Sequence, residues 1–170
     1  LSTENNSLFR MRTIQDICNK VKTINIFEYV SKNKFIYWIN YRFQPFLLIK
    51  KLNEKIKKEI NKNNYHITWI EKGIFIHPKT LKKIKNKTIL IHFNPDNCFG
   101  PREDGCWKTF IKCINLYDYN LLPRRINLGE YRRIGSKKNY LFPFTYDKKQ
   151  QFFEKLNKKF PFTINNYVFV

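Results

Sequence analysis

TILIHFNPDN, residues 88–97, joins an almost continuous run of apolar residues to an Asn-Pro turn. A short run that is apolar on both faces is typical of an interior strand of a parallel sheet. YHITWI at 65–70 and YNLL at 119–122 lie before and after it in the chain, with helical patterns between. Strands that alternate with helices at this spacing predict βαβ units. We therefore expect an α/β fold with a Rossmann-like, doubly wound and mostly parallel sheet.

Helical periodicity predicts amphipathic helices over residues 7–20 and in the segment that follows Pro45. The apolar stripe of the second helix is Leu48, Leu52, Ile56 and Ile60. Residues 31–42 are aromatic and fit no single period. Further strands are expected at 21–27, 139–144 and 166–170. Four more helices are expected: one begins at Pro78, and one begins with a capping box of Asn127 and Glu130. Of the other two, one spans 148–159 and one carries Trp107, Phe110, Ile111 and Ile114 on one face.

The composition indicates a folded domain with a large positive charge. The chain has 170 residues, of which 42% are apolar, and its 33 Lys and Arg outnumber 13 Asp and Glu to give a net charge of +20. No apolar stretch approaches the roughly 20 residues that span a bilayer. The charge fits contact with nucleic acid or an anionic membrane, but lysine dispersed among Asn and Ile also arises from AT-rich codon usage. We expect a cytoplasmic protein, with peripheral contact with an anionic membrane left open.

The cysteines and histidines do not have the spacing of metal ligands. Four Cys occur without a close pair, and no two of the three His share a helix face. The motifs of nucleotide triphosphatases, simple dehydrogenases and α/β-hydrolases are also absent from the sequence. We expect reduced, partly buried thiols, histidines in the core or on the surface, and no metal or cofactor.

The strand exits are the natural places for a binding site, because open parallel sheets bind ligands beyond the carboxyl ends of their strands. Asp96 follows the interior strand, where a carboxylate can accept a proton from a hydroxyl or hold a sugar. The alternative is that Asn94 and Asp96 only shape an Asx-Pro turn and that Asp104, beside Glu103, caps the next helix.

Two further exits carry basic residues. In Glu71-Lys72-Gly73 the glycine permits a close backbone approach and the lysine can meet a phosphate, although a plain turn fits as well. Arg124 and Arg125 follow YNLLP and can either clamp an anion or lie as surface charges beside a helix start.

Four stretches occur in the order and spacing of one known family. They are SLFRMRTI at 7–14, WIEKGIFIHPKTLKKIK at 69–85, ILIHFNPDN at 89–97 and YDYNLLPRRINLGEYRRIGSKKNYLFPFTYD at 117–147. Together they resemble the amino-terminal half of the glycosyltransferases related to the spore maturation protein CgeB. The resemblance covers residues 7–147 and depends on all four stretches, since no single one is specific.

The resemblance implies the GT-B fold, in which two Rossmann-like lobes face each other across a crevice. It implies that residues 1–160 form the acceptor-side lobe without its first strand and that 161–170 begin a second, truncated lobe. A missing carboxyl-terminal lobe would bind the nucleotide-sugar donor, so this fragment of the enzyme would be inactive alone. The reaction would transfer the sugar to a hydroxyl of a glycan, lipid-linked or protein acceptor without an essential metal.

The resemblance also assigns roles to residues at the strand exits. Asp96 matches the aspartate of the family's Asn-Pro-Asp turn and would be the catalytic acid/base or would orient the acceptor. Ser7 and Arg10 would meet phosphate at the amino terminus of the first helix. The residues expected to bind substrate are Asn94, Ser7, Arg10, Lys72, Gly73 and Arg124.

Two other functions remain open. In a nucleic-acid-binding module, lysines would contact phosphates and the aromatic residues, 17% of the chain, would stack on bases. The charge is spread over every segment rather than gathered in one stripe, which weakens this interpretation. A non-catalytic remnant of the transferase fold, binding a glycan or a partner, is the other.

Overall fold

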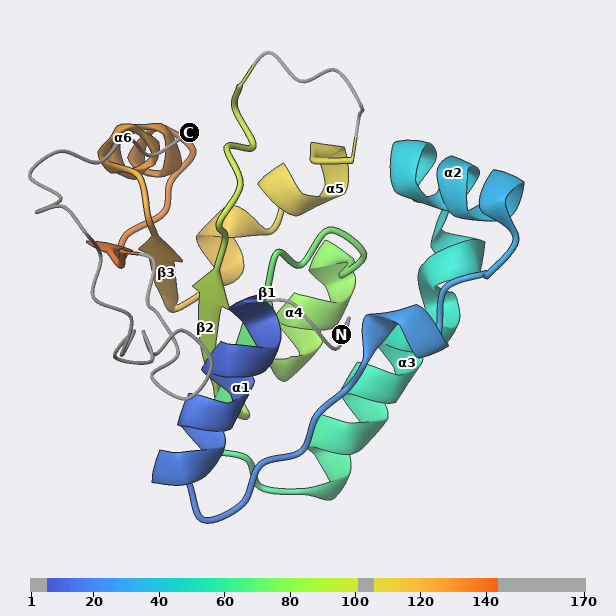
Figure 1. Ribbon diagram of the computed structural model, residues 1–170, viewed down its shortest axis with the longest axis horizontal. Helices are drawn as coiled ribbons and strands as arrows, with labels where there is room; N and C mark the ends of the chain where they lie inside the picture. Colours follow the sequence, from blue (N-terminus) through green and yellow to red (C-terminus); the bar gives the residue numbers. More distant parts are fainter. Residues whose placement is uncertain (1–5, 101–105, 144–170) are drawn as a thin grey trace, which may run out of the picture.

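The computed structural model describes residues 6–100 and 106–143, and its centre is a four-stranded parallel sheet (Figure 1). The strands lie in the order β1-β2-β3-β4 and every neighbouring pair is parallel. Helices cover both faces of the sheet, so the predicted α/β, Rossmann-like fold class is confirmed. The strands are β1 Ile67–Glu71, β2 Ile89–Phe93, β3 Tyr119–Leu122 and β4 Asn139–Leu141.

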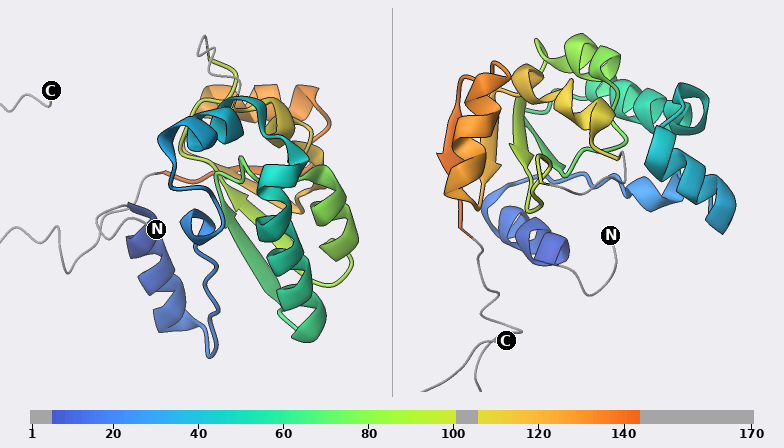
Figure 2. Two further views of the ribbon diagram at one scale, coloured as in Figure 1. Left: turned by 90° about the vertical axis from the view of Figure 1, so that its right-hand side faces the viewer. Right: turned by 90° about the horizontal axis from the view of Figure 1, so that it is seen from above.

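The helices form two unequal layers (Figure 2). One face of the sheet is covered by α1, and the other by the connections between strands together with α3, which packs on α4. Within these described residues, no helix is both long enough and apolar enough to cross a bilayer. The helices are α1 Asn6–Ile17, α2 Lys34–Phe43, α3 Phe46–Lys62, α4 Pro78–Ile84, α5 Lys108–Ile111 and α6 Arg125–Arg133, with short 3-10 helices η1 Ile26–Glu28 and η2 Ile114–Leu116.

The core lies between the sheet and the α3–α4 side. Leu90 of β2 and Leu81 and Ile84 of α4 are fully buried there. The buried stripe of α3 is Ile49, Leu52, Ile56 and Ile60, whereas the predicted member Leu48 is 37% exposed. A step of three residues followed by steps of four keeps side chains on one face of a helix with 3.6 residues per turn better than equal steps of four do.

Two of the local predictions are wrong. Residues 21–27 form no strand; they lead into η1, where the side chain of Asn25 accepts a hydrogen bond from the Phe27 amide. An Asx contact of this kind offers the backbone an alternative to a strand ladder. The expected capping box is also wrong, because Arg124 holds the N-cap position of α6 and Asn127 lies inside the helix.

The structure defines the end of α6 and the conformation of residues 31–42, whose sequence fits no single period. The helix ends just before Gly135, whose φ of +88° is a left-handed conformation that glycine adopts without strain. The segment 31–42 contains most of α2, which Asn33 caps by accepting hydrogen bonds from the amides of Phe35 and Ile36.

Several expected features lie outside the described residues. These are Glu103 and Asp104, the helix at 148–159, the strand at 166–170 and the domain boundary at 160/161.

The alternation of β2 gives a direct test of the core. Leu90 is fully buried and its neighbour Ile89 is 46% exposed. We expect Leu90→Ala to lower the free energy of unfolding by about 3 kcal/mol, because it leaves a cavity in the core. Ile89→Ala is the matched control and should cost less than about 1 kcal/mol. Urea unfolding measures both, and equal losses would contradict the register of the strand.

Candidate functional site

The carboxyl ends of β1, β2 and β3 lie along one edge of the sheet, as parallel pairing requires. Pairing continues one residue past two of these ends. The Lys72 amide donates to the Phe93 carbonyl at 2.9 Å, and the Asn94 amide donates to the Leu121 carbonyl at 3.3 Å. The segments that carry Lys72, Asn94 and Arg124 are therefore neighbours, as the sequence predicts.

Lys72 and Asp96 meet at this edge. The Lys72 Nζ lies 2.8 Å from Asp96 Oδ2, and the two side chains are 47% and 34% exposed. The pair is therefore open to solvent, and each partner can be reached by a ligand. An exposed ion pair of this kind contributes about 0–1 kcal/mol to stability.

Asn94 fixes the turn that carries Asp96. Its side chain is fully buried, and its Oδ1 accepts a hydrogen bond from the Asp96 amide at 3.1 Å. Its Nδ2 donates to the Tyr131 hydroxyl at 3.3 Å, which ties the turn to α6. Asn94 thus positions Asp96, and the contact is the same one that an Asx turn makes.

Lys72 and Gly73 form a left-handed turn, with φ values of +58° and +67°. A Cβ at position 73 would lie 2.8 Å from the Tyr117 hydroxyl oxygen and 3.2 Å from a methyl carbon of Ile70. The close approach for which glycine was expected is therefore an approach to buried side chains. Gly73 shapes the turn that presents Lys72.

Ser7 and Arg10 bind the carboxylate of Glu71, whereas the sequence predicted that they bind a phosphate. The Arg10 Nε and Nη2 donate to the two Glu71 carboxylate oxygens at 2.6 and 2.8 Å, and the Ser7 hydroxyl donates to the same carboxylate at 2.5 Å. Burial opposes ionisation of Glu71, but the hydrogen bonds from Arg10 and Ser7 outweigh it and hold the pKa of this carboxyl below its usual range. The guanidinium also lies 4.3 Å from the centre of the Phe93 ring.

Arg124 is the candidate at the exit of β3. It precedes α6 as an exposed residue, and Arg125 beside it is exposed as well. Among the residues that the structure describes, neither arginine forms an ion pair with a carboxylate. Both interpretations of these arginines, an anion clamp and a surface charge, stay open.

His92 lies beneath the edge, and sequence reasoning assigned it no role. Its Nδ1 lies 3.0 Å from Asn120 Oδ1, its Nε2 lies 3.4 Å from the Lys72 carbonyl oxygen, and its ring stacks on Tyr117 with centroids 4.5 Å apart. Burial lowers the pKa of His92 to about 4, although the hydrogen bond with Asn120 opposes this shift. The imidazole is neutral at pH 7 and supports the turn at Lys72. The sequence feature that could have indicated this role is a histidine inside an otherwise apolar strand.

Two cysteines near the edge are buried and behave as packing residues. Burial raises the pKa of Cys98 and of Cys113 to about 12, so both thiols stay protonated. In the described part of the chain, no group of three or more His, Cys, Asp or Glu side chains could hold a metal ion.

Comparisons of the chain with protein-family models, with curated proteins and with solved structures gave no match.

Gly73 provides the first test of the site. We expect Gly73→Ala to lower the free energy of unfolding by about 2 kcal/mol, because the left-handed backbone is strained for alanine and the new methyl group meets Tyr117. Gly129→Ala is the matched control, since a Cβ there meets nothing within 4 Å and the residue lies in α6. The control should raise stability by up to about 1 kcal/mol in urea unfolding. A stable Gly73→Ala protein would contradict the described turn.

His92 predicts a dependence of stability on pH. Because its folded pKa of about 4 lies below the usual histidine pKa of 6.5, the unfolded chain binds a proton first as the pH falls. The free energy of unfolding should be about 2 kcal/mol lower at pH 5 than at pH 7. His92→Gln should remove most of this difference, and His66→Gln, at an exposed position, should retain it. Equal pH profiles for all three proteins in urea unfolding would exclude His92 as the cause.

Proposed function

We propose that this chain is the acceptor-side lobe of a glycosyltransferase that moves a sugar from a nucleotide-sugar donor to a hydroxyl acceptor. The observation that carries the proposal is the accessible Asp96 carboxylate beside Lys72 at the carboxyl edge of a parallel sheet. The resemblance of the four sequence stretches to CgeB-like enzymes supports the same assignment.

Two cation–carboxylate pairs occur at this edge, and they differ in burial. The side chains of Arg10 and Glu71 are 9% and 18% exposed, and their contact is bidentate. Removing one partner of such a pair leaves a buried charge and costs about 3–5 kcal/mol. The exposed pair of Lys72 and Asp96 can exchange its contact for a ligand at far lower cost. Of these four groups, Lys72 and Asp96 are the ones available for chemistry.

In the proposed reaction, Asp96 accepts the proton of the acceptor hydroxyl while that oxygen attacks the anomeric carbon of the donor sugar. The bond from the anomeric carbon to the phosphate oxygen breaks, and the nucleoside diphosphate leaves with the bonding electrons. Lys72 releases Asp96 and turns its ammonium toward the negative charge that develops on the phosphate. Asn94 holds the backbone of Asp96 throughout.

The remaining predicted residues take supporting roles in this proposal. Arg124 adds positive charge at the exit of β3 for the anionic donor, and Gly73 shapes the turn of Lys72. Ser7 and Arg10 stabilise the edge through Glu71 rather than through the substrate. The donor itself would be bound by a second lobe, so activity is expected of the protein made from the complete reading frame.

Asp96 is tested in that complete protein by the release of nucleoside diphosphate from a panel of nucleotide sugars. We expect Asp96→Asn to lower kcat by about 100-fold or more, since the amide cannot accept the proton. Stability should change by less than about 1 kcal/mol, because only an exposed ion pair is lost. Asp118→Asn is the control; this residue caps the opposite edge by accepting from the Leu90 amide, and turnover should not change. Unchanged turnover in Asp96→Asn would remove Asp96 from the mechanism.

A further inference from the structure

The α2 helix has aromatic side chains on its open face as well as on its buried one. Tyr37 and Tyr41 are half-buried and pack against the core. Asn40 and Gln44, at its carboxyl end, point into the protein and are 1% and 6% exposed. Phe35, Trp38 and Phe43 point outward and are 68%, 54% and 65% exposed. A helix on the surface of a protein normally buries its apolar stripe and exposes its polar one.

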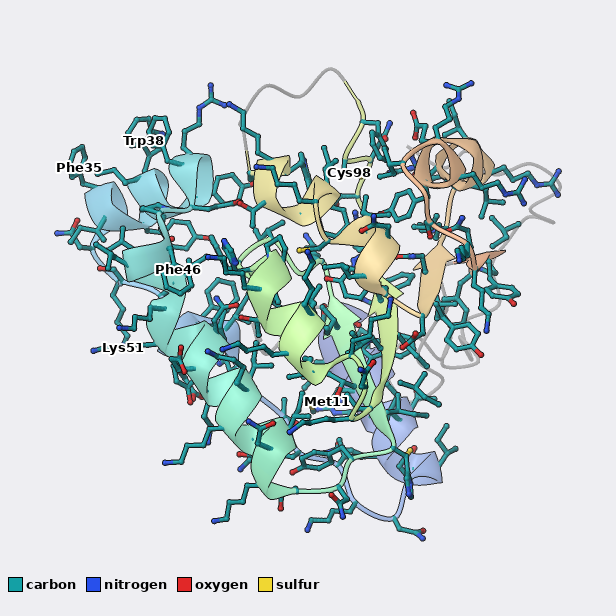
Figure 3. All side chains as sticks on the ribbon, turned by 180° about the vertical axis from the view of Figure 1, so that it is seen from behind. Met11, Phe35, Trp38, Phe46, Lys51 and Cys98 are labelled. Atoms are coloured by element: carbon teal, nitrogen blue, oxygen red, sulfur yellow. The ribbon has the colours of Figure 1, made fainter. Side chains whose placement is uncertain are left out.

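The exposed apolar side chains continue into the start of α3. Of the fourteen exposed large hydrophobic residues in the described ranges, seven lie between positions 35 and 48. Ring contacts join three of them, because Trp38 stacks on Phe35 at 6.2 Å and meets Phe43 edge-on at 5.8 Å. Figure 3 shows Phe35 and Trp38 projecting away from the body of the molecule. We call this set the α2–α3 patch: Phe35, Ile36, Trp38, Phe43, Phe46, Leu47 and Leu48.

The stretch of sequence that carries the patch has positive charge alone. No Asp or Glu occurs between Glu28 and Glu54 in the sequence, whereas lysines stand on both sides of the patch. At the start of α2, Lys32 and Lys34 also line a hollow of about 380 Å³ whose walls include Phe27, Val30 and Tyr37. Lys50 and Lys51 are exposed on α3. The occupant of this surface should therefore be apolar and anionic together.

We propose that the α2–α3 patch docks the protein on a membrane that contains anionic phospholipids. Aromatic and aliphatic side chains would enter the boundary between head groups and acyl chains, while the flanking lysines would contact lipid phosphates. Three aliphatic members, Ile36, Leu47 and Leu48, have no use in stacking on bases, which favours a membrane over a single-stranded nucleic acid.

The position of the patch deepens the proposed function and depends on it. Figures 1 and 2 show α2 at the end of the molecule where the loops after β1 and β2 lie. Two contacts join the patch region to that edge: the Gln44 side chain donates to the Cys106 carbonyl, and Phe46 packs edge-on against His77 at 5.2 Å. Docking through the patch would bring Asp96 toward the bilayer, so the acceptor class would be a lipid-linked hydroxyl.

Docking is tested by flotation with phosphatidylcholine vesicles that contain or lack phosphatidylglycerol. We expect binding to the anionic vesicles and at least about tenfold weaker binding of the triple variant Phe35→Ser, Trp38→Ser, Phe43→Ser. The control is Ile17→Ser, Ile67→Ser, Ile126→Ser, at exposed positions outside the patch, and it should bind like the parent. Circular dichroism checks that each variant is folded. Equal binding of patch and control variants would overturn the proposal.

The lysines are tested in the same assay. Replacing Lys32, Lys34, Lys50 and Lys51 with Gln should weaken binding at least about tenfold, and replacing the exposed Lys58, Lys62, Lys82 and Lys83 should weaken it less, although both variants lose the same charge. The tryptophan fluorescence of the parent should shift to the blue on anionic vesicles, and Trp38→Phe should lose the shift while it still floats.

Other occupants give different results. Binding to an oligo-dT strand that is lost in the patch variant, with no flotation, would assign the surface to nucleic acid. Self-association in size-exclusion chromatography that the patch variant abolishes, with no flotation, would assign it to a second copy of the chain. Either result overturns the membrane proposal. The vesicles carry no donor or acceptor sugar, so flotation of Asp96→Asn should equal that of the parent, and docking and catalysis can fail independently.

Discussion

The buried pair of Arg10 and Glu71 is the contact on which the arrangement of the edge depends. It joins α1 to the end of β1 across 61 positions of sequence and places the guanidinium over Phe93 of β2. Nε and Nη2 of the guanidinium both donate to the carboxylate, and Ser7 donates to it as well. Without these hydrogen bonds, burial of the Glu71 carboxylate would lower the stability of the fold. The contact therefore fixes α1 against the edge of the sheet. Because the pair uses up Arg10, the positive charge left open at the exit of β1 is that of Lys72.

A second set of polar contacts holds the loops from the face of the sheet that α3 and α4 cover. Asn53 of α3 donates to the Phe75 carbonyl and accepts from the His77 amide, which fixes the loop after β1. Asn120 donates to Ser136 and to the Ile114 carbonyl, which joins β3 to the start of β4 and to η2. Buried amides of this kind are stable because nearly every donor and acceptor has a partner. The asparagines that looked like products of base composition therefore determine where the loops run.

The sequence predicted the features that depend on local period and missed those that depend on distant partners. The strands β2 and β3 and the helices α3 and α4 were found because each carries its own apolar pattern. The false strand at 21–27 had suitable residues but no neighbouring strand, which no local pattern reveals. The turn at Asn94 and Asp96 was found from its dipeptide. The capture of Arg10 by Glu71 was missed, because each residue alone looks like a solvated charge.

The contrast between α2 and α3 argues that the α2–α3 patch is more than a product of composition. Both helices lie in the same Lys- and Asn-rich stretch of chain, so the same codon usage acted on both. In α3 the isoleucines and Leu52 are buried, with exposed lysines such as Lys50, Lys51 and Lys58 among them, as expected for a helix that covers a core. At α2, Asn40 and Gln44 are buried beside the half-buried Tyr37 and Tyr41, and three further aromatic rings, Phe35, Trp38 and Phe43, are exposed. Drift toward lysine and asparagine would place polar residues on the open face of α2, whereas that face carries three exposed aromatic residues.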